Sequence, residues 1–204
     1  MYIPDIYKNE DPEQIRGFLR KFSFGILVNR NYGKFWATHT PMELEQDENG
    51  KEFLYGHISR ENPQWQSFAS GEEVMAIFNG PNSYISPSWY DHENVPTWNY
   101  AAIHVYGKIS IVEGDAVMNF LEKLIDRYES TVEKPIKMKN LSPELLLQAR
   151  GIVCYKIEIR EIHAVNKMSQ NRDDKNFRSI ISKLEKTGEP NAIAVAEEMK
   201  KCPR

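Results

Sequence analysis

The sequence contains little cysteine, no long apolar run and no excess of positive charge. Only two of the 204 residues are cysteines, Cys154 and Cys202, which is too few for a disulfide framework or a cysteine-based zinc site. The longest apolar segments span only a few residues, as at 109–112, so no transmembrane helix is expected. The N-terminal residues carry acids where a secretory signal would be basic and then apolar. These features predict a cytoplasmic protein with no membrane partner.

The charge balance does not favour a nucleic-acid partner. The formal net charge is −3 and the isoelectric point of the sequence is about 6.0, whereas duplex-DNA-binding domains usually carry a strongly basic face. Basic residues gather only at 134–139, in a segment typical of a solvated loop, and a few more occur near the C-terminus, such as Arg178, Lys183 and Lys186. Direct DNA binding therefore stays an alternative that the charge does not support.

Several motifs of catalysis and metal binding are also missing. None of the five histidines forms an H-x-H or H-x-x-x-H pair, so no metal site is expected from local spacing. There is no G-x-S-x-G nucleophile motif, and no glycine-rich turn between a strand and a helix that would cradle a dinucleotide. No catalytic residue is identified from the sequence.

The hydrophobic pattern predicts a mainly β fold with peripheral helices. Alternation, β-branched residues and turn signals such as Asn49-Gly50 predict several short strands joined by hairpins. The predicted strands cover residues 24–30, 34–44, 52–58, 73–78, 83–86, 100–112 and 153–159. Helices are predicted after the capping residues Asp11, Asn62, Asp115 and Ser142 and in the C-terminal segment, where Phe177, Ile180, Ile181 and Leu184 form one stripe and Ile193, Ala196 and Met199 another. This order is typical of an antiparallel barrel with helices packed outside it.

Three clusters combine polar and aromatic residues in segments too polar for simple core strands. They lie at 37–41, at 56–65 and at 84–90 with its continuation 95–100, and a polar run at 167–172 follows the last strand. Hydroxyl groups, imidazoles and an arginine can hold a phosphate, and flat aromatic rings beside amides can stack on a heteroaromatic ring. The clusters therefore predict a phosphorylated planar cofactor, either a flavin or a pyridoxal-type group. The structural alternative is that the aromatics plug a barrel end and that Asn171 caps a helix.

The motifs MYIP, ATHTP, GHISRENPQW, YISPSWY, VPTWNY and KMSQNR occur in this order along nearly the whole chain. Their order and spacing resemble the PaiB-like family, named as FMN-binding negative transcriptional regulators of protease synthesis and sporulation. The resemblance implies a split β-barrel of antiparallel, Greek-key-like type and a homodimer with FMN between the subunits. Two departures are Met42, where the family commonly has Phe, and residues 163–166, which lack a tryptophan often found there.

The resemblance also implies which residues contact FMN and how the chain is organised. A split-barrel domain is expected over 1–172 and a C-terminal helical extension over 173–204. The implied FMN contacts are Thr38, His39 and Thr40 along one strand face, His57, Ser59 and Arg60 at the phosphate and ribityl chain, Trp98, Asn99 and Tyr100 at the ring, and Lys167, Gln170 and Asn171 completing the site.

Arg60 is the residue most expected to hold the phosphate. A helix predicted to start at Asn62 and Pro63 would add free N–H groups beside it, and the alternative for Arg60 is a surface ion pair with Glu61. The implied function is that of a flavin-dependent sensor or transcriptional regulator. The alternatives are a flavin-dependent oxidoreductase, for which neither His39 nor His57 is an obvious general acid or base, and a direct DNA-binding repressor.

Overall fold

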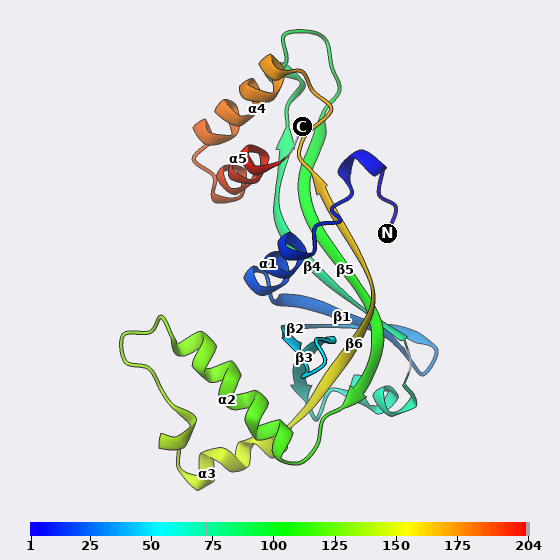
Figure 1. Ribbon diagram of the computed structural model, residues 1–204, viewed down its shortest axis with the longest axis vertical. Helices are drawn as coiled ribbons and strands as arrows, with labels where there is room; N and C mark the ends of the chain where they lie inside the picture. Colours follow the sequence, from blue (N-terminus) through cyan, green and yellow to red (C-terminus); the bar gives the residue numbers. More distant parts are fainter. Residues whose placement is uncertain (72, 203–204) are drawn as a thin grey trace. The chain divides into compact units, whose positions relative to one another are not determined.

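Residues 1–71 and 73–202 are described by the computed structural model, which has a mainly β fold with helices (Figure 1). The strands are β1 (Phe24–Asn31), β2 (Lys34–Gln46), β3 (Glu52–Ser59), β4 (Glu73–Ile85), β5 (Thr97–Ile111) and β6 (Ile152–Lys167). The α-helices are α1 (Pro12–Lys21), α2 (Asp115–Glu129), α3 (Pro143–Leu146), α4 (Asp174–Lys186) and α5 (Pro190–Lys201). The 3₁₀ turns are η1 (Asp5–Tyr7), η2 (Pro63–Ser70), η3 (Pro87–Trp89), η4 (Met138–Asn140) and η5 (Leu147–Gly151).

The six strands close into a barrel in the order β1-β2-β3-β6-β5-β4. Strand β1 pairs antiparallel with β2 and β4, and β3 pairs antiparallel with β2 and β6. The β1–β2 hairpin closes through Tyr32 and Gly33, both of which have positive φ, as the tight hairpin turn of this type requires. The predicted antiparallel barrel with peripheral helices is therefore confirmed.

The described chain divides into two compact units, each made of discontinuous segments. We call residues 1–22, 78–104 and 162–204 the terminal unit, and residues 23–77 and 105–161 the central unit. The boundary at residue 172 stays a prediction, whereas the terminal unit combines segments from both sides of that position.

In the central unit, inward-facing side chains of the strands form the barrel interior. Gly56 lies beside Tyr155 of β6, and a Cβ atom on Gly56 would come within 2.4 Å of the Tyr155 hydroxyl, so a larger residue cannot fit there. The Tyr155 ring in turn packs edge-on against Phe68 of η2, with ring centroids 5.5 Å apart. Fully buried apolar residues of this unit include Leu27, Met42, Leu54, Phe68, Ala76, Tyr155 and Ile157.

Helix α2 packs on the outer face of β3 and β6 in the same unit. Phe120 joins Val112 and Cys154 in a small buried cluster, to which Tyr55 and Leu124 also contribute. A polar contact anchors the end of the helix, because Glu43, a buried carboxylate on β2, pairs with Arg127 and accepts a hydrogen bond of 2.9 Å from the Tyr128 hydroxyl. The helix starts after Gly114, and Asp115 is its first residue rather than its cap.

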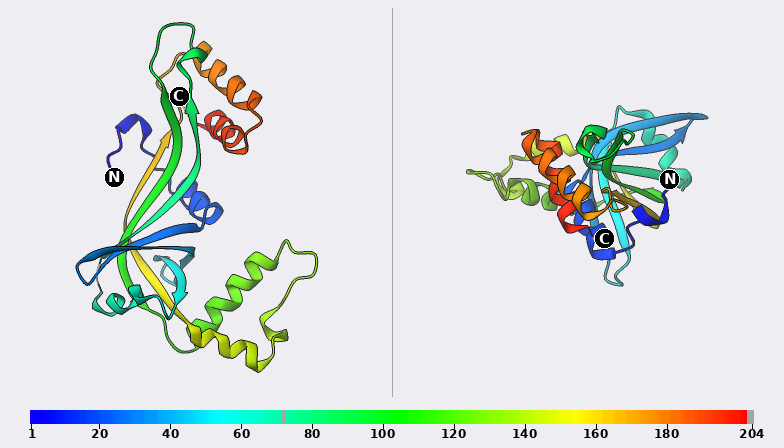
Figure 2. Two further views of the ribbon diagram at one scale, coloured as in Figure 1. Left: turned by 180° about the vertical axis from the view of Figure 1, so that it is seen from behind. Right: turned by 90° about the horizontal axis from the view of Figure 1, so that it is seen from above.

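In the terminal unit, α4 and α5 pack on the ends of β4 and β5 (Figure 2). Asp173 caps α4 by accepting hydrogen bonds from the main-chain N–H groups of Lys175 and Asn176, so the suggested cap Asn171 is wrong. The buried face of α5 contains Val195, Ala196 and Met199. Ile193, which was predicted to belong to this stripe, is exposed instead.

The predicted strands at 73–78 and 83–86 form one continuous strand, β4, which runs through Gly80 and Pro81. Among the described residues no helix has both the length and the apolar composition that a membrane span requires.

Candidate functional site

The predicted residues on β2 do not share one face, because successive side chains of a strand alternate. Thr38 donates a short hydrogen bond to the Gln64 side chain and accepts one of 2.8 Å from Asn62, while Thr40 donates to the main-chain oxygen of His57 at 2.8 Å. His39 is exposed, with its ring stacked near Phe24 at a centroid distance of 6.3 Å. The prediction that all three line one face is therefore corrected, and only His39 has an exposed side chain.

Polar residues of the GHISRENPQW motif form a hydrogen-bond network centred on Gln64. Its side chain is fully buried, and its amide nitrogen donates to the Leu27 main-chain oxygen at 3.2 Å and to Asn29 at 2.9 Å. Asn29 donates to Ser67 at 2.6 Å, and Asn62 caps η2 by accepting from the Gln64 N–H. These hydrogen bonds satisfy buried polar groups and fasten η2 to β1 and β2.

His57 lies on the outer face of β3, where its ring meets the edge of Phe120 at a centroid distance of 6.3 Å. Burial lowers the pKa of His57, and its Nδ1 atom has no hydrogen-bond partner. A neutral imidazole against α2 is a weaker phosphate partner than a protonated one would be. Ser59, on the same face, is exposed and accepts a hydrogen bond of 3.2 Å from the Glu61 N–H.

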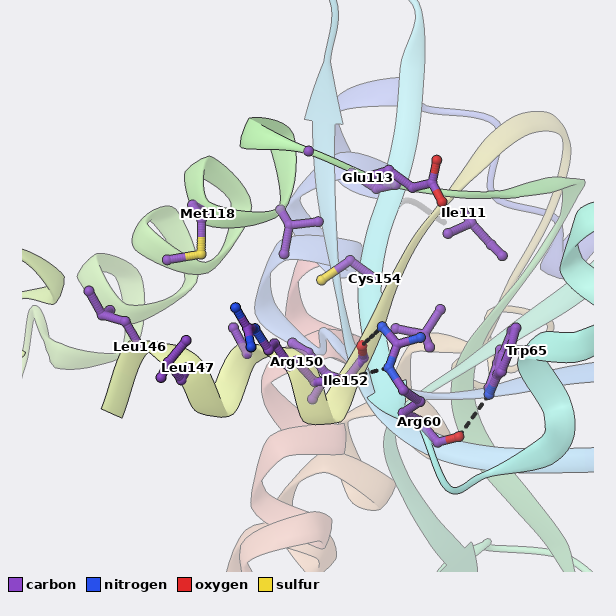
Figure 3. Close-up of a pocket in the computed structure, with 15 residues that line it drawn as sticks. Arg60, Trp65, Ile111, Glu113, Met118, Leu146, Leu147, Arg150, Ile152 and Cys154 are labelled. Carbon is purple, nitrogen blue, oxygen red and sulfur yellow. Dashed lines mark hydrogen bonds between the residues drawn. The ribbon is translucent and has the colours of Figure 1, made fainter. Parts of the chain in front are cut away.

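Arg60 is tied to the main chain at the junction of η5 and β6 (Figure 3). Its guanidinium donates from Nε to the Arg150 oxygen at 2.8 Å and from Nη2 to the Ile152 oxygen at 2.9 Å. The Trp65 indole donates to the Arg60 oxygen at 2.8 Å, and its ring lies 6.0 Å from the guanidinium carbon. Arg60 therefore does not form the ion pair with Glu61 that was the alternative prediction. Its guanidinium group is also not free of contacts with the protein.

Trp98, Asn99 and Tyr100 lie on β5 in the terminal unit and also alternate. Asn99 is buried, accepts a hydrogen bond of 3.0 Å from Ser169 and contacts the sulfur of Met199. Trp98 is 53% exposed, and its ring meets Tyr84 edge to face at 6.2 Å. The side chains of Trp98 and Tyr100 point away from Asn99 and contribute to an open hollow.

This aromatic hollow has a volume of about 300 Å³. Its lining residues are Asn79, Gly80, Asn82, Trp98, Tyr100 and Ala101. Asn79 and Asn82 were not predicted as site residues, because Gly80 and Pro81 between them suggested a break between two strands. The available signal was the pair of amide side chains on either side of that break.

Two of the three residues predicted at and after the end of β6 make internal contacts. Lys167 donates from Nζ to the Thr97 hydroxyl at 2.7 Å, at the start of β5. Gln170 folds back on its own loop, accepting from the Met168 N–H at 2.7 Å and donating to the Asn166 oxygen. Asn171 is exposed.

Aromatic residues of the YISPSWY motif, which also suggested a cofactor, take part in packing. Tyr90 is buried and Trp89 is partly buried against the core that contains α4. The two departures from the family pattern are also accommodated. Met42 is fully buried in the barrel, and His163 accepts a hydrogen bond of 2.7 Å from the N-terminal amine at its Nδ1 atom.

The aromatic hollow combines the kinds of side chain that can contact a planar heteroaromatic ring. Two aromatic side chains supply flat apolar surface, and two amides supply donors and acceptors for a ring edge. Within the described residues, His, Cys, Asp and Glu side chains form no group of three that could hold a metal ion.

Comparison with known proteins identifies the class and then the family. The fold is shared with an FAD and heme binding protein from Mycobacterium smegmatis, with a TM-score of 0.60 at 13% identity over 85% of this chain and 79% of that one. It is also shared with the flavocytochrome Anf3 from Azotobacter vinelandii, with a TM-score of 0.58 at 14% identity over 87% and 78%. The predicted split-barrel class is therefore confirmed.

Sequence comparison gives the family. Residues 1–161 match the family described as "Putative FMN-binding domain", and the chain belongs to this family. It is 40% identical over 200 residues to the protease synthase and sporulation protein PAI 2 of Bacillus subtilis, covering 98% of this chain and 96% of that protein. The PaiB-like resemblance is confirmed, and FMN is the cofactor of the family.

Proposed function

We propose that this protein holds the FMN ring against the aromatic hollow of the terminal unit and acts as a flavin-dependent sensor or transcriptional regulator. The observation that carries the first part is the hollow itself, in which Trp98 and Tyr100 project from one face of β5 beside Asn79 and Asn82. An exposed indole ring is well suited to stack on a flavin, and the amides are suited to hydrogen-bond its polar edge.

For the phosphate we propose Lys167, a predicted FMN contact whose ammonium group lies beside the Thr97 hydroxyl at the start of β5. A lysine ammonium acts on a phosphate as a point charge, while a neighbouring hydroxyl adds a hydrogen bond. Arg60 is the competing partner, but it belongs to the central unit, whereas Lys167 and Trp98 both belong to the terminal unit. Of the other predicted contacts, His39, Ser59 and Asn171 keep exposed side chains.

The regulatory part is supported by the relative named for protease synthesis and sporulation and by the chemistry of the hollow. Among its lining residues Tyr100 alone carries a titratable side chain, so no carboxylate or imidazole stands ready there for general acid–base catalysis. Bound FMN would supply redox chemistry, and the chain would bind and orient it. Steady oxidation of NADH or NADPH by the FMN-loaded protein would favour an oxidoreductase instead.

A titration with FMN, followed by flavin fluorescence and by thermal unfolding, tests the binding proposal. At a hundred-fold excess over the dissociation constant, FMN should stabilise the wild-type protein by about 2.7 kcal/mol. Trp98→Ala should weaken binding about tenfold, which corresponds to about 1.4 kcal/mol of lost stacking, because the ring loses its aromatic partner. Trp36→Ala is the matched control, since Trp36 is a partly exposed tryptophan of the central unit, and it should bind FMN as the wild type does.

Two further variants locate the phosphate. Lys167→Met should weaken FMN binding without changing the affinity for riboflavin, which lacks the phosphate, whereas Arg60→Ala should leave both affinities unchanged. The reverse result would move the phosphate to Arg60. If saturating FMN changes neither the spectrum nor the melting temperature of the wild type, the binding proposal is wrong.

A further inference from the structure

A pocket of the central unit shares no lining residue with the aromatic hollow and has not yet been assigned a ligand. It has a volume of about 450 Å³, within the range of small-molecule sites. We call it the arginine groove. Its lining residues are Arg60, Trp65, Ile111, Val112, Glu113, Gly114, Val117, Met118, Leu146, Leu147, Ala149, Arg150, Ile152, Val153 and Cys154.

Most of the arginine groove is apolar. Met118 comes from α2, Leu147 from η5 and Ile152 from the start of β6, and Leu147 is 51% exposed (Figure 3). Burial raises the pKa of the Cys154 thiol to about 11, so Cys154 contributes a neutral surface to this wall. An apolar molecule of suitable size would be removed from water here, which is favourable in proportion to the area covered.

The charges of the lining favour an anion. Its charged side chains are two arginines, Arg60 and Arg150, and one glutamate, Glu113. In the view of Figure 3 the two arginine side chains lie on either side of Ile152. Arg60 is already fixed by two hydrogen bonds to main-chain oxygens and retains three of its five N–H donors, so it can bind an anion with little loss of side-chain freedom.

We propose that the arginine groove is a second ligand site, which takes a small carboxylate with an aliphatic or aromatic body. The carboxylate lies between Arg60 and Arg150, and the body covers Met118, Leu147 and Ile152. No residue of the arginine groove lines the aromatic hollow, and the proposal does not depend on FMN binding.

The test uses the fluorescent sulfonate 1-anilinonaphthalene-8-sulfonate as an anionic apolar probe and decanoate as its competitor. The wild-type protein should bind the probe at one site, and decanoate should displace it, whereas decyltrimethylammonium, a cation with an alkyl chain of similar length, should not. Leu147→Glu should abolish probe binding. Leu145→Glu is the matched control, because Leu145 is 50% exposed on the neighbouring helix α3 and does not line the groove, so it should bind as the wild type does.

Arg150 tests the charge. Arg150→Gln should weaken probe binding about tenfold, as expected for one lost charge-assisted hydrogen bond, and Arg150→Lys should recover most of that loss. Arg160→Gln, an exposed arginine of β6 outside the groove, should change nothing. Circular dichroism and melting temperatures show whether each variant is folded.

Two results would overturn the proposal. If Leu147→Glu and Leu145→Glu, both folded, bind the probe equally, the probe does not occupy the groove. If saturating FMN displaces the probe from the wild type, the groove is part of the flavin site and not a second site. Absence of FMN binding with intact probe binding would refute the proposed function and leave this proposal standing.

Discussion

At the residue scale, many polar side chains of the sequence motifs form hydrogen bonds within the fold and do not present a surface for a ligand. Thr38, Asn62 and Gln64 hydrogen-bond to one another, and Arg60 binds main-chain oxygens. Residue types in a motif indicate which bonds are possible, whereas the partners depend on strands brought together from distant parts of the chain. The sequence could therefore identify these positions as special but not distinguish an internal network from a cofactor contact.

His57 provides a pH-dependent prediction at the same scale. Burial lowers the pKa of His57 in the folded protein below its ordinary value of 6.5, so the unfolded chain binds a proton more readily. The stabilising contribution of the neutral ring is therefore complete above about pH 6.5 and is lost as the pH falls below it. Urea unfolding at pH 7 and pH 5 should show a smaller loss of stability in His57→Phe than in the wild type.

The control for this prediction is His39→Phe, which changes an exposed histidine of the same unit and should keep the wild-type pH dependence. Part of the dependence should remain in His57→Phe, because burial also lowers the pKa of His104. Identical pH slopes for the wild type and His57→Phe would show that His57 does not contribute.

At the scale of elements, most helices and strands were predictable because their signals are local. Asp11 caps α1, Gly71 ends η2 with positive φ, and the hairpin turn at Tyr32 and Gly33 has the expected geometry. The errors arose where tertiary contacts override local signals. Strand β4 continues through Gly80 and Pro81, because strand pairing within a sheet overrides the local turn signal of these two residues.

Helix α1 contains a glycine with no structural reason to be there. A Cβ atom on Gly17 would meet nothing within 4 Å, and the residue is exposed in the middle of the helix. Because glycine costs about 1 kcal/mol relative to alanine inside a helix, Gly17→Ala should stabilise the protein and raise its melting temperature by about 2–4 °C.

Gly114→Ala is the matched control, since a Cβ atom there also meets nothing within 4 Å but the backbone has a φ of 66°. That substitution should lower the melting temperature because alanine is strained in this conformation. A melting temperature of Gly17→Ala at or below that of the wild type would contradict the helix-propensity explanation and point to an unseen contact at this position.

At the scale of the whole molecule, the sequence allowed the barrel class to be predicted but not the assembly of a site. Alternation and hairpin signals indicate antiparallel neighbours, whereas the β3–β6 pairing joins residues about 100 positions apart and leaves no local signal. The predicted FMN contacts fall in both compact units, His39 in the central one and Trp98 in the terminal one. Which of these residues contact the same FMN molecule depends on how the units and the protein chains assemble. The pattern of a single sequence does not specify that assembly.

The homodimer implied by the family resemblance leads to a prediction about the β1–β2 hairpin. Phe24 is 65% exposed and Phe35 is 81% exposed, and the strand register places them on the same outward face. Exposed apolar faces of this kind mark interaction surfaces, and twofold dimers are the commonest closed assemblies. We therefore expect this face to be covered by a second copy of the chain.

Light scattering after size-exclusion chromatography should give a mass twice the 23.8 kDa of the chain for the wild-type protein. Phe35→Glu should shift the mass toward one chain, because a carboxylate cannot be buried unpaired in an interface. Val132→Glu changes a partly exposed apolar residue after α2, outside the hairpin, and should remain dimeric. A monomeric wild type would refute the homodimer, whereas a dimeric Phe35→Glu variant would place the interface on another face.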